Sequence, residues 1–174
     1  AGTQRNLTKS VIIGNQAVFV MTTGNASTII GYQAGYDLTT ANSNVLYGYR
    51  SGYNLTTGGH NTAIGYETLY TDTDGDYSVA VGYRALYTQT GDRQNTAIGV
   101  SAGLNITTGQ RNTLLGYQSG DTITNGGENI IIGYGADVNA TATSNTIVIG
   151  YNATPTDNGQ TILGTSTQKF TLIG

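Results

Sequence analysis

Nine glycines recur at an even spacing of 17 residues, and each closes a short run of mostly apolar residues such as VIIG, TAIG or IVIG. A fixed period without insertions predicts a stack of equal units, because each repeat must bury its apolar residues against its neighbours. We therefore expect function in a repetitive surface or an assembly rather than in one pocket. The nine residues, named here the glycine column, are Gly14, Gly31, Gly48, Gly65, Gly82, Gly99, Gly116, Gly133 and Gly150.

The consensus unit, N-T-A-I-G-Y-Q-A-G-Y-N-L-T-T-G-x-x, combines two kinds of local chemistry. The residues before the column glycine are small, apolar or β-branched, which favours strands. The N-L-T-T-G stretch after it is typical of turns. Seventeen residues accommodate about two short strands and two turns, which is one coil of a β-solenoid. We predict an all-β solenoid of nine coils, about 40 Å long at one strand spacing per coil.

Three positions in the unit suggest how each coil is packed. The residue before the column glycine is always large and apolar, as in Ile13 and Leu115, so we expect it inside the coil. The third residue after the glycine is never larger than threonine, as in Ala34 and Thr68, which predicts a close approach of backbone. The residue two before the glycine is also apolar throughout. Since neighbouring strand residues point to opposite faces, we expect this position to face outward.

An outward apolar column would expose a long patch to water, and such patches mark interaction surfaces. The simplest way to cover it is a homotrimer closing on its own axis. The interface candidates are Ile12, Ile29, Leu46, Leu114, Ile131 and Val148.

The period shortens after Gly150, where the next strand ends, TILG and TLIG, follow at intervals of 14 and 10 residues. Shrinking repeats indicate a cap or a transition. We divide the chain into a lead-in over residues 1–9, a nine-coil solenoid over 10–159, and shortened repeats over 160–174 that lead to a stem or to a removed chaperone.

The motifs N-T-A-I-G-Y and S-N-T-I-V-I-G resemble those of two related groups of proteins. One is the head of trimeric autotransporter adhesins, which implies left-handed parallel β-rolls with three chains to a head. The other is the repeat region of bacteriophage tail fibres, where segments like Ser144–Gly150 followed by Thr161–Gly174 often lead into a cleaved intramolecular chaperone. The resemblance implies an extracellular, trimeric host-attachment protein on a virion or a bacterial surface.

Tyrosines form two further columns. One follows the glycine in seven of nine copies, and the other comprises Tyr36, Tyr53, Tyr70 and Tyr87. Both fit stacked ladders that stabilise the coils, but the second column is our candidate for contacting a glycan or protein receptor, because we expect it to be the more exposed. Thr-Thr pairs such as Thr39–Thr40 form a row that leaves ice binding as a distant alternative.

Acidic residues provide little basis for catalysis. Asp72, Asp74 and Asp76 alternate in one turn, which suits either a Ca²⁺ loop or an ordinary solvated turn. Asp121 and Asp137 stand at different distances from their glycines, so we expect no stacked carboxylate pair. His60 is the only histidine and cysteine is absent. We predict no enzymatic activity and no required cofactor, with a polysaccharide-cleaving solenoid as a distant alternative.

A net charge of −3 with seven basic residues argues against binding to nucleic acid, and no apolar run approaches the length of a membrane span. The first ten residues lack a charged-then-apolar signal region, so we interpret the chain as a piece of a longer or processed protein. The expected function is attachment, first as a phage tail fibre and second as a bacterial adhesin head.

Overall fold

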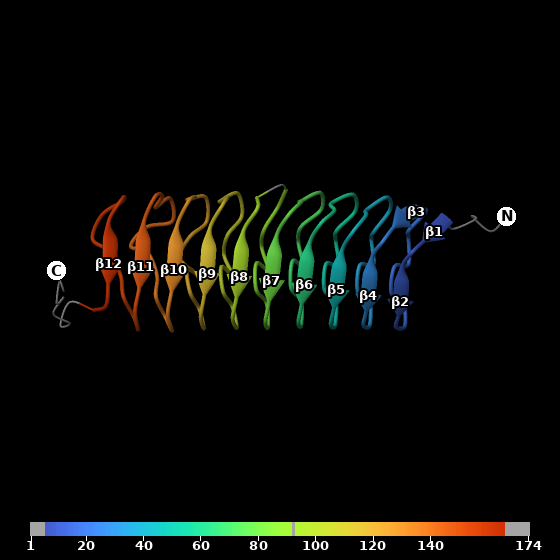
Figure 1. The fold of residues 1–174 in the computed structure, drawn as a ribbon, viewed down its shortest axis with the longest axis horizontal. Coiled ribbons are helices and arrows are strands. Elements are labelled where there is room, and N and C mark those ends of the chain that lie inside the picture. The colour runs from blue at the N-terminus through green and yellow to red at the C-terminus, as the bar shows by residue number, and fades with distance from the viewer. Residues whose placement is uncertain (1–5, 92, 166–174) are drawn as a thin grey trace.

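The structure is a computed structural model that describes residues 6–91 and 93–165, in which the chain is all-β without a helix. From β2 to β11 successive strands of the main sheet start 17 residues apart, so the predicted β-solenoid is confirmed (Figure 1). The strands are β1 Asn6–Thr8, β2 Val11–Ile13, β3 Thr23–Asn25, β4 Thr28–Ile30, β5 Val45–Tyr47, β6 Thr62–Ile64, β7 Val79–Val81, β8 Thr96–Ile98, β9 Thr113–Leu115, β10 Ile130–Ile132, β11 Ile147–Ile149 and β12 Thr161–Leu163.

One parallel sheet of ten strands runs the length of the rod, in the order β12-β11-β10-β9-β8-β7-β6-β5-β4-β2. Equivalent residues of neighbouring coils pair with one another, as Leu114 does with Ile131 and Ile131 with Val148. A separate pair, β1 and β3, lies at the N-terminal end (Figure 1). The shortened interval before Gly164 is accommodated, because β12 still pairs with β11 in register. The second predicted strand end, Thr171–Gly174, lies outside the described residues.

Each coil contains one three-residue strand in the main sheet rather than the two expected, because left-handed residues interrupt the extended backbone. Two residues after the column glycine φ is positive, at 51° for both Arg50 and Glu67, and it is positive again before the strand, at 59° for His60. The turns nonetheless hydrogen-bond from coil to coil, as when Arg50 N–H donates to Tyr32 O at 2.9 Å and Glu67 N–H to Tyr49 O at 2.8 Å. Coil-to-coil bonding therefore continues into the turns.

The glycine column is a line of very close backbone contact between coils. Its members have φ between 133° and 146°, a region that side-chain-bearing residues rarely adopt. A Cβ built on Gly99 would lie 2.1 Å from the carbonyl oxygen of Gly116, and one on Gly65 would lie 2.2 Å from that of Gly82. No side chain fits at that distance. The even spacing of 17 thus records a contact that only glycine can make.

The two apolar strand columns face opposite to the prediction. The middle residue of each main-sheet strand is the buried one, and Ile29, Leu46, Leu114, Ile131 and Val148 are fully buried within the single chain, while Ile12 packs partly buried against the core. The predicted trimer-interface residues therefore fill the coil. The flanking residues point outward, with Ile13 58% and Leu115 45% exposed.

The interior is filled by columns whose sizes compensate. Where the middle strand residue is alanine, as in Ala63, the fourth residue after the column glycine is leucine, as in Leu69, except in the coil of Ala97, where it is Gly103. Where the strand residue is large, as in Leu46, that position is glycine, and a Cβ on Gly52 would lie 3.0 Å from Leu46 Cδ1. Close packing demands this exchange of volume. The third position after the glycine is small and buried in nearly every coil, as predicted.

Candidate functional site

The first tyrosine ladder, formed by the residues that follow the column glycines, is exposed. Neighbouring rings stack with centroids 4.9–5.5 Å apart, and Val100 interrupts the row. Exposure runs from 36% at Tyr49 to 65% at Tyr151. Because the ladder begins directly after each strand, it borders the sheet along the rod. Its members are Tyr32, Tyr49, Tyr66, Tyr83, Tyr117, Tyr134 and Tyr151.

The second tyrosine ladder contains the predicted receptor-contact residues Tyr36, Tyr53, Tyr70 and Tyr87 and begins at Phe19, with centroids 5.1–5.3 Å apart. These tyrosines are half-buried, so the expectation that this column is the more exposed one is wrong. Within either ladder each ring covers the face of the next. A pyranose that binds by stacking needs an uncovered ring face, so the interior of a ladder offers it mainly edges and hydroxyls.

Arginines bridge the two ladders. The Arg50 guanidinium lies 5.1 Å from the ring centroid of Tyr49 and 5.3 Å from that of Tyr53. Arg84 sits the same way between Tyr83 and Tyr87 and forms a 2.8 Å ion pair with the buried Glu67. Each guanidinium is attracted by the negative faces of the two rings that it approaches. We interpret this surface chiefly as a brace between coils.

The threonine column, defined as the eighth residue after each column glycine, is largely tied to the backbone. Thr56 Oγ1 donates to Thr73 O at 2.7 Å, and Thr107 Oγ1 donates to Thr124 O at 3.1 Å. The first threonine of each pair noted in the sequence belongs to this column. The column comprises Thr22, Thr39, Thr56, Thr73, Thr90, Thr107, Thr124 and Thr141.

Asp72, Asp74 and Asp76 do not converge. Asp72 is fully buried and accepts from Gly75 N–H, Gly91 N–H and Gln89 Nε2. Asp74 is exposed and accepts from the neighbouring threonine hydroxyl, whereas Asp76 turns to a backbone N–H of the preceding coil. Among the described residues no group of three acidic or histidine side chains is placed to hold a metal ion. The turn therefore lacks the geometry of a Ca²⁺ loop.

Asp72 and Gln89 form a polar cluster inside an otherwise apolar column. Equivalent positions in other coils hold Met21, Leu55 and Ile106, all buried. Gln89 Nε2 donates to Asp72 Oδ2 at 2.8 Å, and Asn95 Nδ2 donates to Gln89 Oε1 at 2.8 Å. Burial raises the pKa of Asp72 to about 6, although its three hydrogen-bond donors act in the opposite direction.

Asp121 and Asp137 come together, contrary to the sequence argument that no carboxylates would pair. Burial, followed by the hydrogen bond and charge of Asp137, raises the pKa of Asp121 to about 6. Asp121 lies five residues after its column glycine and Asp137 lies four residues after its own. The two side chains come together because these two repeats are unequal. Glycosidases keep their two carboxyl groups about 5 Å or more apart to admit substrate or water, so a directly bonded pair does not match that arrangement.

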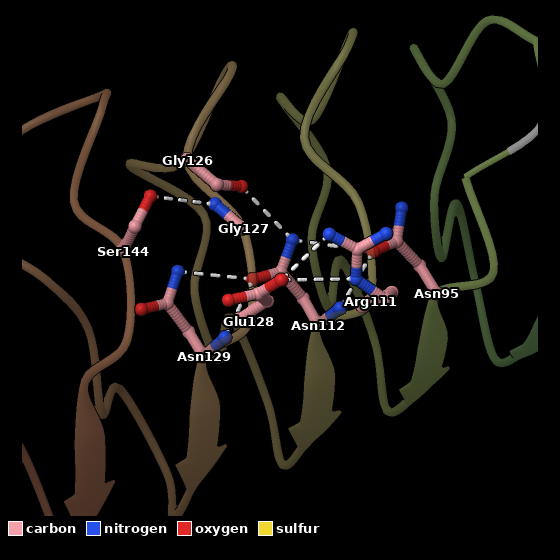
Figure 2. Close-up of polar contacts among 8 residues, drawn as sticks. All are labelled: Asn95, Arg111, Asn112, Gly126, Gly127, Glu128, Asn129 and Ser144. Carbon is pink, nitrogen blue, oxygen red and sulfur yellow. Dashed lines mark hydrogen bonds and ion pairs between the residues drawn. The ribbon is translucent and has the colours of Figure 1, made fainter.

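A buried asparagine column joins the coils at the residue before each strand (Figure 2). Asn112 Nδ2 donates to Gly126 O at 3.0 Å, and Asn112 Oδ1 accepts from Asn129 N–H at 3.1 Å and Asn129 Nδ2 at 2.9 Å. Beside it, Arg111 and Glu128 form an exposed ion pair at 2.6 Å (Figure 2). The sequence signal for this column is the recurrence of asparagine at multiples of 17 residues, at Asn44, Asn61, Asn95, Asn112 and Asn129.

Replacing Asn112 by serine is expected to lower the free energy of unfolding by about 2 kcal/mol, because Gly126 O and Asn129 lose buried partners. Serine occupies this column at Ser27 and Ser78, so shape alone does not forbid it. Urea unfolding followed by circular dichroism measures the change. The control Gln110→Ser alters an exposed amide two residues away and should stay within about 0.5 kcal/mol. An equal loss in both variants would contradict a special role for the column.

Comparison with protein-family models, curated proteins and solved structures gives no match for this chain. No helix of the described residues is long and apolar enough to cross a membrane. The functional argument therefore rests on the surfaces of the solenoid itself.

Proposed function

We propose that this chain is a structural segment of a homotrimeric, extracellular attachment fibre, first of all a bacteriophage tail fibre, that holds a rigid repetitive surface toward a cell-surface receptor. A bacterial adhesin head of the same architecture is the alternative. The observation that carries the proposal is the sheet face, defined as the outward-pointing residues of β2 and β4–β12. It is a stripe of exposed and partly exposed side chains, mostly aliphatic, along the whole described rod.

The sheet face carries no charged residue. Its exposed members include Val11 at 50%, Tyr47 at 54% and Ile98 at 40%, and threonine is its only residue without an aliphatic or aromatic body. Three-residue strands make the face about 10 Å wide and the rod makes it about 40 Å long. A contiguous patch of about 400 Å² is comparable with the largest apolar patch of an ordinary monomer, which is often a functional surface.

A second copy of the chain fits this face better than an unrelated protein, because only a solenoid with the same coil spacing can match it along ten strands. About 400 Å² of sheet face is less than the roughly 800 Å² per partner of a stable interface. The first tyrosine ladder supplies a second exposed apolar strip that borders the sheet. Sheet face against tyrosine strip is a heterologous contact, which closes into a ring when the rotation between copies divides a full turn and otherwise extends into a filament. A ring of three is the closed form proposed for this chain.

Light scattering coupled to size exclusion tests the assembly. We expect three chains of 18.1 kDa, about 54 kDa in total. Replacing Ile98 and Leu115, which pair across β8 and β9, by lysine should yield monomers, since two unpaired charges would be buried in each of the three interfaces. The control replaces the exposed Thr40 and Thr57 by lysine and should leave the trimer intact. A monomeric native chain overturns the proposal, and so does dissociation by the control pair alone.

A further inference from the structure

A groove of about 540 Å³ lies on the rod away from the ten-stranded sheet, because none of its lining residues belongs to a strand. It opens where the second tyrosine ladder ends at Tyr87 and the same position in later coils holds Leu104 and then Asp121. An acidic side chain thus lines the groove at a ladder position that holds tyrosine in earlier coils. The lining residues are Thr88, Asn105, Thr107, Asp121, Thr122, Thr124 and Thr141.

The floor of the groove is rich in hydrogen-bond acceptors, because the protein already uses most of its donors. Thr88 Oγ1 donates to Leu104 O at 2.7 Å, and Thr107 Oγ1 donates to Thr124 O at 3.1 Å. Asn105 Nδ2 donates to Asp121 O at 2.8 Å. A hydroxyl that has donated its hydrogen keeps its lone pairs as acceptors. A matching ligand must therefore supply O–H or N–H donors.

The charge of the lining further restricts the class of ligand that the groove can bind. Among the described residues of the lining Asp121 is the one charged residue, and the neighbouring Asp137, whose carboxylate accepts from Thr122 N–H, interacts with it. None of these described lining residues is basic, so an anionic ligand would meet only repulsion from them. The column threonines Thr107, Thr124 and Thr141 also repeat once per coil, so the floor offers its acceptors at a regular interval along the rod.

We propose that this groove is a binding site for a saccharide chain that carries hydroxyl and N–H donors and no acidic groups. This inference rests on the proposed attachment function and places the receptor contact at the threonine groove rather than at Tyr36, Tyr53, Tyr70 and Tyr87. A polymer of sugars has donors at a regular spacing, which suits a site built from equal coils. The second tyrosine ladder serves as a brace on the neighbouring coils.

The test uses immobilised oligosaccharides as probes, namely cellohexaose, maltohexaose, mannohexaose and chitohexaose against hexagalacturonate and hexaguluronate, with binding followed by surface plasmon resonance. Thr107→Val/Thr124→Val removes two groove hydroxyls and two rungs of the threonine column. The matched control, Thr39→Val/Thr56→Val, removes two rungs of the same column outside the groove. We expect at least one neutral hexamer to bind, the groove variant to lose roughly tenfold in affinity, and the control to stay within roughly twofold.

Binding of the uronates above the neutral probes, absence of binding to every neutral probe, or equal losses in the two variants would each overturn the site. Light scattering on the same samples separates this result from the assembly. Trimers that bind no neutral probe refute the groove and leave the fibre proposal standing. Monomers that bind through the groove refute the fibre and leave the site standing.

Discussion

Replacing Gly99 by alanine is expected to lower the free energy of unfolding by more than about 4 kcal/mol, in the range reserved for severe defects. Its φ of 146° is a conformation that alanine rarely adopts. The new Cβ would lie 2.1 Å from Gly116 O and 2.6 Å from Gly116 C, both of which are backbone atoms that cannot rotate away. Two coils must therefore separate at the centre of the rod.

Hydrogen exchange read by mass spectrometry, combined with urea unfolding, measures this effect coil by coil. In a stack where each unit contacts only its neighbours, losing one interface should expose the amides on both sides of it first. We expect the peptides around β8 and β9 to lose protection before those near β5. The control Gly159→Ala has φ of 72° and no heavy atom within 4 Å of the added Cβ, so only backbone strain of about 1–2 kcal/mol is expected. A Gly99→Ala protein as stable as this control would refute the close-contact explanation.

The period alone was sufficient to predict the solenoid and its direction of stacking, because a spacing of 17 with no insertion fixes which residues become neighbours. It did not determine which strand face is inside. Both columns are apolar, so alternation carries no information at these positions. The column directly before the glycine contains no small residue and is therefore the predicted interior. In the structure the interior is instead the middle column of the strands, which contains Ala63 and Ala80.

A signal for the correct face was nevertheless present in the sequence. Ala63 and Ala80 are followed six residues later by Leu69 and Leu86, while Leu46 is followed by Gly52; Ala97, followed by Gly103, is the exception. Two columns that trade volume in this way must share one packed space. The outward column shows no such exchange, since nothing in the chain limits its size. Tertiary contacts such as that of Asp121 with Asp137 had no comparable signal, because their positions in the unit differ.

The backbone conformation of the turn residues could not be predicted from the repeat pattern either. The N-L-T-T-G stretch indicates a turn, but residues such as Glu67 and Leu69 have no intrinsic preference for positive φ. They adopt it because coil-to-coil hydrogen bonds over-determine the backbone there. The second predicted strand per coil was lost for this reason.

Acidification from pH 7 to about pH 4 is expected to stabilise the rod, and Asp72 is the main cause. Burial raises the pKa of Asp72 to about 6 in the folded chain, against about 4 for an unfolded aspartate. Between these values the folded state keeps a proton that the unfolded state releases. Stability is therefore greatest below about pH 4 and is lost as pH rises through 6, by about 3 kcal/mol for two pKa units.

Asp72→Asn isolates this contribution, since asparagine is neutral throughout and its Oδ1 can still accept from Gly75 and Gly91 N–H. Urea unfolding of both proteins at pH 4 and pH 7 gives the difference in their free energies of unfolding. We expect that difference to move by about 3 kcal/mol in favour of the variant as pH rises. Asp74→Asn, exposed in the same turn, serves as the control and should change the pH dependence only slightly, because the charge of Asp74 is the smallest of the causes that act on the pKa of Asp72.

If acid instead destabilises the native chain relative to Asp72→Asn, that result also has a definite physical meaning. Three donors point at the Asp72 carboxylate, and if they outweighed desolvation, the charged form would be favoured in the fold and acid would destabilise the native chain relative to Asp72→Asn. Asp121 contributes in the same direction as Asp72 through its own raised pKa, so only the difference between native and variant assigns the effect to Asp72. If acid stabilises the rod, then its least stable part at neutral pH is the pair of coils that hold Asp72 and Gln89 in place of leucine or isoleucine.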